Sequence, residues 1–399
     1  MNDPHATPRP YDLVVFGATG FTGRLVARHL ASAAPDTVRW AIAGRNRGKL
    51  LALKAELIAC APRFESVDIV VADIADAPTL RRLAQGTRAV LNTAGPFNRH
   101  GEPVVRACVE SGTDYLDLSG EAAFVDRIER AYAETARRNG VRLVPCCGFE
   151  AVIADLGVLF TLQHMPIDGP VAVRGYVKLN GQLSGGSQQT ALLAMRDLRR
   201  ARLPAPPIDT RRRVRELRPT LGWRSALRGW VLPMTMIDQD IVLRSAASLP
   251  AYGQDFGYAH HIVFGRYTTL LGVVGRLLTM AVCARWPPTR RWMETRLRQP
   301  GDGPGPRDIE RGWFRMRFEA ISGRNTACAE VSGGDPGYGE TAKILAQAGL
   351  CLVENHGLPR LAGLLTPAQA MGDALIGRLQ AAGIDFRREH AFAIAREQP

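Results

Sequence analysis

One stretch near the start of the chain constrains the fold more than the rest, residues 11–23 with the sequence YDLVVFGATGFTG. An apolar run leads directly into three glycines, and a helical pattern follows over residues 24–33. In a strand, turn and helix unit, such glycines allow the tight turn, the approach of a pyrophosphate to the backbone, and close packing of helix on strand. The stretch therefore predicts a dinucleotide site at the amino end of a helix. The predicted contacts are Gly17, Ala18, Thr19, Gly20, Phe21, Thr22 and Gly23.

The surroundings of this stretch favour a binding unit over a glycine-rich turn between two core elements. Residues 14–16 form a short apolar run, as expected for a strand buried on both faces of a parallel sheet. Residues 38–43 supply a second run at the distance that a βαβ unit requires.

The end of that second run indicates which dinucleotide is bound. An NAD-preferring fold normally has an acidic residue here to bind the ribose 2′-hydroxyl, whereas this chain has Arg45, Asn46 and Arg47. Arg45 can bind a 2′-phosphate with two hydrogen bonds, and Arg47 or Lys49 can add charge. We therefore predict NADP(H), with Arg45 and Asn46 among its contacts. The alternative is a solvated cationic loop, since arginine is abundant throughout the chain.

Size and charge limit the classes of protein to consider. At 399 residues the chain exceeds the usual size of one core, which predicts two domains. The net charge of +13 indicates an anionic partner: a phosphorylated cofactor, a carrier thioester, an anionic membrane surface or nucleic acid. The chain has no nucleic-acid motif, so nucleic acid is disfavoured. The seven cysteines show no metal-ligand spacing, which predicts that the chain has no metal site. These cysteines fit a reducing cytoplasm, and the polar first ten residues do not resemble a signal peptide, so we expect a cytoplasmic protein.

Strand and helix patterns alternate through the first 155 residues. After the first two strands, we expect strands at residues 66–73, 88–93, 114–118 and 141–145, with helices at 48–59, 77–84, 102–111 and 122–139. This pattern predicts an α/β Rossmann fold with a doubly wound parallel sheet over residues 1–155. Ligands lie beyond the carboxyl ends of such strands. Asp73 could therefore accept from the adenine amino group or cap the next helix, and the turn Thr93, Ala94, Gly95 and Pro96 would lie near the nicotinamide ribose.

A different pattern predicts an inserted α+β substrate domain over residues 156–333. Residues 171–179 and 313–321 alternate like half-exposed antiparallel strands, and 241–245 and 260–264 are shorter candidates. Residues 334–399 return to helical patterns that would pack back on the first domain.

Two segments of the insert suggest contact with an anionic or apolar partner. Residues 196–218 are rich in arginine, which fits a solvated loop or the docking of an acidic carrier or lipid head group. Arg276 splits the apolar residues 268–284, so a transmembrane helix is disfavoured. A buried helix, an acyl-pocket lining and peripheral contact with a bilayer remain open.

Several phrases together resemble one family. They are VVFGATGFTG at 14–23, AIAGRN at 41–46, NTAGPFNRHGEPVVRAC at 92–108, DYLDLSGE at 114–121, CGFEAVIADLG at 147–157 and LLTPAQAMGDALIGRL at 364–379. The chain resembles the saccharopine dehydrogenase-like oxidoreductases, and within them the trans-acting enoyl reductases of bacterial lipid biosynthesis. The resemblance implies an NADP(H)-dependent enzyme that reduces a carbon–carbon double bond of an acyl or polyketide intermediate, free or carrier-bound.

Such a reduction needs a proton donor near the nicotinamide. His100, a few residues past Gly95, is the predicted donor, and an exposed loop histidine is the alternative. Glu121 and Glu150 follow strand ends on the same side and could orient a ligand or cap a helix. Two rival functions remain open: a non-catalytic NADP-binding protein at a lipid surface, and an imine or keto reductase acting on a small metabolite. A homo-oligomer is compatible with the sequence.

Overall fold

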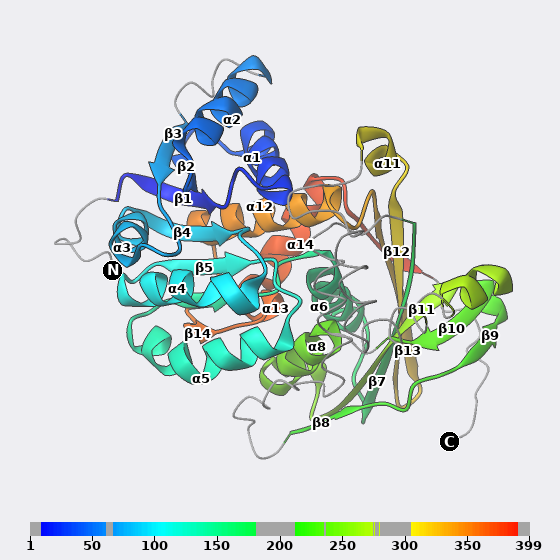
Figure 1. Ribbon diagram of the computed structural model, residues 1–399. Coiled ribbons are helices and arrows are strands. Elements are labelled where there is room, and N and C mark those ends of the chain that lie inside the picture. The colour runs from blue at the N-terminus through cyan, green and yellow to red at the C-terminus, as the bar shows by residue number, and fades with distance from the viewer. Residues whose placement is uncertain are drawn as a thin grey trace. The chain divides into compact units, whose positions relative to one another are not determined.

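The computed structural model describes residues 9–60, 67–180, 212–234, 237–273, 275, 279 and 305–389. The chain divides into two compact units. The first contains Met1–Gly148 and Thr341–Leu375, and the second contains Phe149–Glu340 and Ile376–Pro399. Each unit is built around one β-sheet (Figure 1).

The sheet of the first unit is parallel throughout, in the order β14-β6-β5-β4-β1-β2-β3. This order confirms the predicted doubly wound Rossmann fold. The strands β1 and β2 are buried along almost their whole length, as their continuous apolar runs predicted. The strands are β1 (Tyr11–Phe16), β2 (Trp40–Gly44), β3 (Asp68–Val71), β4 (Thr87–Asn92), β5 (Asp114–Asp117), β6 (Arg142–Val144) and β14 (Gly363–Leu364). The sequence did not predict β14, because two residues carry no periodicity.

The helices predicted within residues 1–155 lie close to their predicted places in this unit, with one exception. They are α1 (Phe21–Ala33), α2 (Arg47–Cys60), α3 (Ala77–Gln85), α4 (Phe97–Glu110), α5 (Ala122–Arg138), α12 (Gly339–Glu354), whose first two residues belong to the second unit, and α13 (Pro367–Ala370). The predicted start of α4 at residue 102 was wrong, since the helix begins at Phe97 and contains Pro103. A proline is more typical of a first helical turn than of a helix interior.

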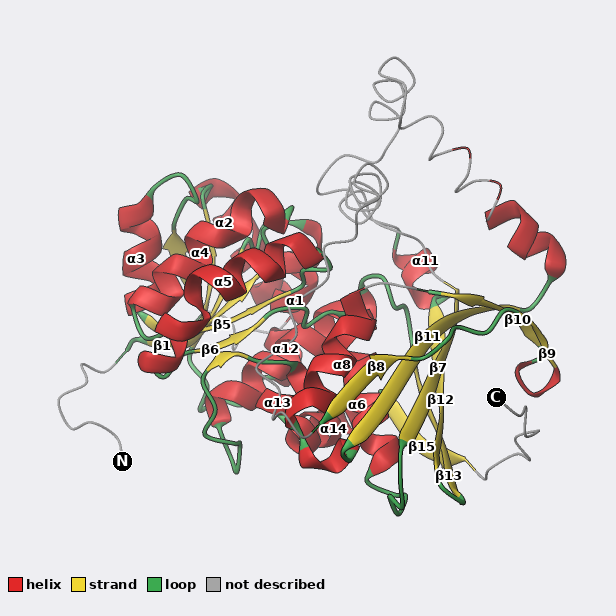
Figure 2. Cartoon of the chain, turned by 90° about the horizontal axis from the view of Figure 1, so that it is seen from below, coloured by secondary structure: helices red, strands yellow, loops and turns green. Residues whose placement is uncertain are grey.

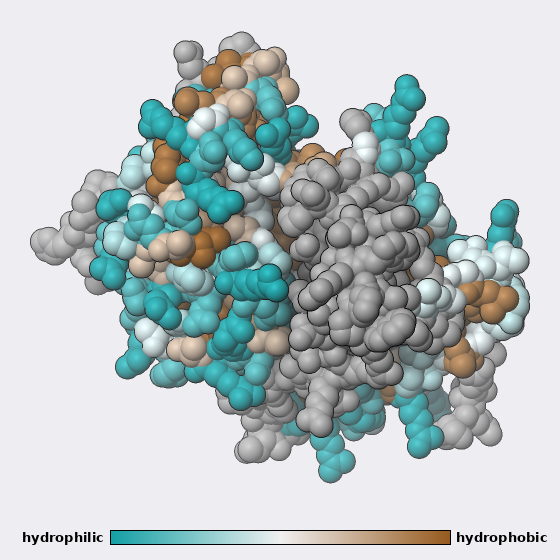
Figure 3. All heavy atoms as spheres, viewed as in Figure 1, coloured by the Kyte–Doolittle hydropathy of each residue, from teal (hydrophilic) through white to brown (hydrophobic). Residues whose placement is uncertain are grey.

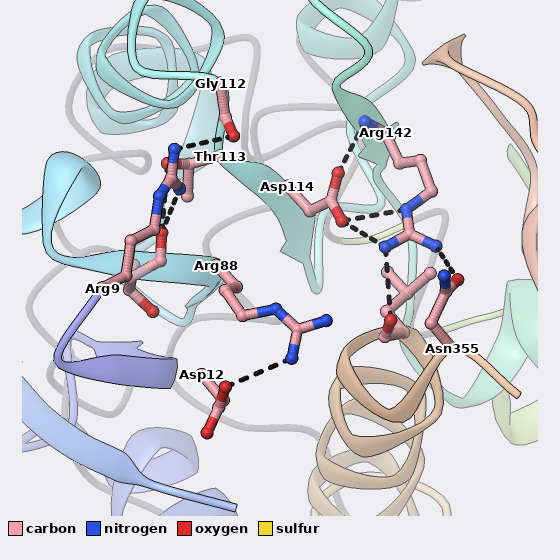
Figure 4. Close-up of polar contacts among 10 residues, drawn as sticks. Arg9, Asp12, Arg88, Gly112, Thr113, Asp114, Arg142 and Asn355 are labelled. Carbon is pink, nitrogen blue, oxygen red and sulfur yellow. Dashed lines mark hydrogen bonds and ion pairs between the residues drawn. The ribbon is translucent and has the colours of Figure 1, made fainter. Parts of the chain in front are cut away.

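An ion pair ties the C-terminal part of this unit to its sheet (Figure 4). Arg142 of β6 donates from Nε to Oδ2 of Asp114 on β5, at 2.9 Å. Its other nitrogens donate to the Leu352 carbonyl at 3.2 Å and to Oδ1 of Asn355 at 2.9 Å, both at the end of α12. The side chains of Arg142 and Asp114 are only 15% and 14% exposed. Water therefore screens this pair little.

We expect Asp114→Asn to lower the free energy of unfolding by about 3 kcal/mol, because it leaves the Arg142 guanidinium largely buried without its counter-charge. The matched control is Glu134→Gln, which breaks an ion pair with Arg137; the side chains of Glu134 and Arg137 are 71% and 47% exposed. Exposed pairs contribute about 0.5 kcal/mol. Urea unfolding followed by circular dichroism measures both changes. Equal shifts of the two midpoints would contradict the assigned role of Arg142.

The second unit contains a mixed sheet in the order β15-β13-β12-β7-β11-β10-β9, with β8 beside β11 (Figure 2). The pairs β7–β11 and β8–β11 are parallel, and the other pairs are antiparallel. The strands are β7 (Val171–Asn180), β8 (Arg213–Glu216), β9 (Gly222–Arg224), β10 (Gly229–Pro233), β11 (Asp255–Phe264), β12 (Trp313–Ser322), β13 (Asn325–Gly333) and β15 (Asp385–Glu389). The strands predicted at 171–179, 313–321 and 260–264 are confirmed as β7, β12 and part of β11.

Two helices, α6 (Phe149–Leu162) and α8 (Ile237–Ser248), cover one face of this sheet. Gly157 of α6 lies against the ring of Phe318 on β12, where a Cβ would come within 2.2 Å of the ring. The predicted strand at 241–245 was wrong, because these residues belong to α8. Nearly every residue of α8 is buried, so its short apolar run shows no helical period and cannot be told from a strand.

The division between the units differs from the predicted boundaries. The first unit ends at Gly148 instead of residue 155, since α6 belongs wholly to the second unit. Residues 334–399 were predicted to be helices that pack back on the first domain. This prediction was wrong for β15, which pairs with β13 in the second sheet. The helix α14 (Gly372–Ala381) spans the point where the chain passes from one unit to the other.

Some predictions fall on residues that the structure does not describe. Most of the arginine-rich segment 196–218 and the later part of the apolar segment 268–284 lie outside the described residues. Among the residues described, no helix combines the length and apolarity needed to cross a bilayer.

Candidate functional site

The glycine turn after β1 has the shape that the sequence predicted. Gly17 has a φ of +81°, in the left-handed region that favours glycine, and a Cβ there would lie 2.9 Å from Thr93 Oγ1. A Cβ on Gly23 would lie 2.3 Å from the Gly17 carbonyl oxygen. Gly20 precedes α1, whose first turn has neither a side-chain cap nor an acidic residue. This helix end therefore fits a pyrophosphate, because neither a capping side chain nor an acidic side chain would compete with the anion there.

The turn after β4 lies against the glycine turn. Thr93 donates to the Phe16 carbonyl oxygen through both its backbone N–H and its hydroxyl, each at 2.9 Å. The Ala94 N–H donates to Oδ1 of Asn92 at 3.0 Å, and Gly95 and Pro96 follow. The structure thus brings the predicted pyrophosphate and nicotinamide segments together, at the carboxyl ends of β1 and β4.

The residues after β2 and β3 occupy the positions expected of the adenosine half of the site. Arg45 is exposed directly after β2, and Asn46 accepts from the Lys49 N–H at 3.0 Å and so caps α2. The predicted alternative of Asp73 as a helix cap was wrong, since Asp76 caps α3 and Asp73 accepts from the nearby Ala75 N–H. The contact of Asp73 with adenine stays a prediction.

A buried network that the sequence did not predict joins the ends of β4, β5 and β6. Asn92 donates to the hydroxyl of Tyr115 at 3.0 Å, and this hydroxyl donates to Asp117 at 2.8 Å. Asp117 also accepts from the Ser119 hydroxyl at 2.7 Å and from the Cys146 N–H at 3.0 Å. Burial raises the pKa of Asp117 above its usual value. The network fixes the side chain of Asn92, and Asn92 in turn accepts the hydrogen bond from the Ala94 N–H in the predicted nicotinamide turn. Its one signal in the sequence is an acidic residue at the end of an apolar strand.

The structure places two of the predicted catalytic residues at the start of α4. Both carboxylate oxygens of Glu121 accept from this helix, from the Phe97 N–H at 3.0 Å and the Asn98 N–H at 2.9 Å. These two hydrogen bonds match the predicted alternative in which Glu121 caps a helix. His100 is half-buried in the first turn of α4, so the alternative of a loop histidine was wrong.

The third predicted catalytic residue, Glu150, lies in the second unit, in the first turn of α6. Burial and the nearby charge of Asp238 raise its pKa to about 7. Oδ2 of the fully buried Asp238 lies 3.3 Å from Nδ1 of His260, and the same nitrogen lies 2.8 Å from the Tyr258 hydroxyl. Burial lowers the pKa of His260 to about 4, which keeps its imidazole neutral at pH 7. The sequence did not predict Asp238 or His260, because α8 and β11 are distant from α6 along the chain.

A doubly wound sheet with a glycine turn at its first crossover is the architecture of dinucleotide-dependent oxidoreductases, and the basic end of β2 favours NADP(H). Residues 13–144 match the family model for the saccharopine dehydrogenase NADP binding domain. Trans-acting enoyl reductases of Mycobacterium tuberculosis (strain ATCC 25618 / H37Rv) and Mycobacterium ulcerans (strain Agy99) are 33% and 32% identical to this chain. Each match covers 94% of this chain and 97% of the relative. The chain belongs to the saccharopine dehydrogenase-like oxidoreductases, in the family of the trans-acting enoyl reductases, and is an NADP-dependent oxidoreductase.

One solved structure agrees with this fold. Apo saccharopine dehydrogenase (L-Glu forming) from Saccharomyces cerevisiae matches 95% of this chain and 100% of its own, with a TM-score of 0.53 and 12% identity. At this identity the likeness supports the α/β fold alone.

Proposed function

We propose that this protein uses NADPH to reduce the carbon–carbon double bond of an α,β-unsaturated acyl or polyketide thioester. The observation that carries the proposal is the similarity, over nearly the whole chain, to proteins named trans-acting enoyl reductases. The glycine turn and the basic end of β2 support the choice of cofactor. The net charge of +13 supports delivery of the thioester on an anionic carrier.

The chain's own residues position the reactants. Bound NADPH would supply the reducing equivalent. The backbone of residues 17–23 would hold its pyrophosphate, Arg45 its 2′-phosphate, and residues 93–96 its nicotinamide ribose. The protein must then orient the thioester and deliver one proton to its α-carbon. We assign this proton to His100, because it lies in the first turn of α4, where its backbone N–H donates to the carbonyl oxygen of Pro96, the last residue of the predicted nicotinamide turn.

The direct test is NADPH oxidation with enoyl thioesters of coenzyme A, pantetheine and a carrier protein. Turnover with the enoyl thioesters, and none with their saturated counterparts, is the expected result. Oxidation only with small imines or ketones would replace the proposal with the imine or keto reductase alternative.

We expect His100→Gln to lower kcat by at least about 100-fold and to leave the Kd for NADPH nearly unchanged, because it removes the proton donor and no predicted cofactor contact. The control His356→Gln changes an exposed histidine that follows α12 and should leave kcat unchanged. Wild-type kcat in His100→Gln would show that the proton comes from another group.

Glu150 should influence how the stability of the protein depends on pH. Because its pKa is raised in the folded state, Glu150 contributes stability that is fully present below about pH 4.5 and is lost as the pH rises to about 7. Glu150→Gln should remove this part of the pH dependence of unfolding. An unchanged dependence would show that Glu150 has an ordinary pKa.

A further inference from the structure

The end of the second sheet at β9 and β10 has apolar side chains on both of its faces. On one face, Val231 and Val263 are buried together with Tyr176. On the other face, Trp230 of β10 lies directly opposite Trp223 of β9. The pleat of a strand sends successive residues to opposite faces, so the tryptophans lie away from this small core. Packing against Tyr176 therefore does not explain them.

These aromatic residues form one continuous strip. The ring centroids of Trp223 and Trp230 are 5.9 Å apart, and those of Trp230 and Tyr267 are 5.3 Å apart. Leu271 follows Tyr267 by four residues in a helical segment, and so lies on the same side of it. Trp223 is 53% exposed, Tyr267 52%, Leu271 54% and Leu221 74%. We call Leu221, Trp223, Trp230, Tyr267 and Leu271 the aromatic edge.

The aromatic edge differs from other exposed parts of the same sheet. On β12 and β13, the pairs across the strands include an ion pair between Arg315, 62% exposed, and Glu330. Figure 3 shows brown and pale atoms together in the region that Figure 1 labels β9 and β10. Contiguous exposed apolar side chains are typical of a surface that binds a partner.

The charge around the aromatic edge indicates the kind of partner. Residues 217–234 and 261–273 contain four arginines and no aspartate or glutamate. Three of these arginines are exposed: Arg218, Arg228 next to β10, and Arg266 next to Tyr267. Tryptophan and tyrosine favour the boundary between lipid head groups and acyl chains, and arginine binds phosphate. An anionic bilayer offers both environments at one surface.

We propose that the aromatic edge is a docking surface for anionic phospholipid membranes, with Trp223 and Tyr267 inserted among the head groups and Arg228 and Arg266 bound to phosphates. This surface belongs to the second unit, whereas the cofactor site belongs to the first. It would hold the protein peripherally at a bilayer, and neither cofactor binding nor turnover is needed for it.

The test is flotation of the full chain with vesicles of phosphatidylcholine alone or mixed with phosphatidylglycerol. We expect binding to the mixed vesicles only. Trp223→Ser should weaken this binding about tenfold, since a tryptophan at the interface is worth about 1.4 kcal/mol. Arg266→Gln should weaken it about fivefold.

Matched controls separate docking from general damage. Trp313, 40% exposed at the start of β12, serves as the control tryptophan, and the exposed Arg324 serves as the control arginine. Trp313→Ser and Arg324→Gln should bind like the wild type, and all variants should keep the wild-type circular dichroism and affinity for NADPH. The proposal is overturned if the wild type floats with neither vesicle, or if Trp223→Ser binds as well as Trp313→Ser. It is also overturned if Trp223→Ser instead dissociates an oligomer in size-exclusion chromatography.

Discussion

Replacing Gly23 by alanine is expected to abolish NADPH binding and to lower the free energy of unfolding by about 3 kcal/mol. The new Cβ would lie 2.3 Å from the Gly17 carbonyl oxygen and 2.8 Å from the Ala18 Cα. Both are backbone atoms of the turn, so no side-chain rotation relieves the overlap. Either α1 moves away from β1 or the glycine turn opens, and both changes disrupt the predicted pyrophosphate site. Calorimetry with NADPH and urea unfolding measure the two effects.

Two further glycines make this prediction specific. Gly377 lies on the exposed side of α14 with no atom near its missing Cβ, so Gly377→Ala should be neutral or slightly stabilising. Gly20→Ala would meet only the Gly17 carbonyl oxygen, at 3.3 Å, and should keep most of the stability while weakening NADPH binding. Normal NADPH affinity in both Gly20→Ala and Gly23→Ala would refute a cofactor role for the turn.

The second large effect is expected at Arg45. Arg45→Gln should raise the Kd for NADPH about 100-fold and leave the Kd for NADH nearly unchanged. A charged, bidentate contact with the 2′-phosphate contributes about 2–3 kcal/mol, and NADH lacks this phosphate. Calorimetric titration of the wild type and of Arg45→Gln, each with NADPH and with NADH, gives the four dissociation constants required.

Arg47 is the matched control, because it is also exposed and lies two residues further along, at the start of α2. Arg47→Gln should change the NADPH affinity only a few-fold, through loss of nearby charge. If Arg47→Gln alone abolished the preference for NADPH, the phosphate contact would belong to Arg47. Equal affinity of the wild type for NADPH and NADH would refute the proposal that the basic residues after β2 determine the preference for NADPH.

Much of the Rossmann unit was predictable because its signals are local. Short continuous apolar runs predicted the buried strands β1, β2 and β4, and the glycine spacing predicted the turn at Gly17. Prediction failed where an element has no period of its own. The strand β14 has two residues, and α8 is buried on nearly all sides, so its residues 241–245 resembled a strand.

Some residues of the candidate site could likewise be placed from the sequence, and other contacts could not. Arg45, Asn46 and residues 93–96 follow strands directly, so the order of strands was enough to place them at one edge of the sheet. Glu121 caps α4, and Asp238 and His260 face one another from α8 and β11. Each of these contacts joins residues that are more than 20 positions apart, and a linear pattern does not encode such pairs.

By itself, the amino-acid sequence determined the fold class, the cofactor and the family, because glycine spacing, apolar runs and the basic residues after β2 act within a few positions along the chain. Only the tertiary structure decided that Glu121 caps a helix, that burial beside Asp238 raises the pKa of Glu150, and that β15 joins the second sheet. Burial and charge act through space, so the surroundings of a side chain exist only once distant segments have packed around it.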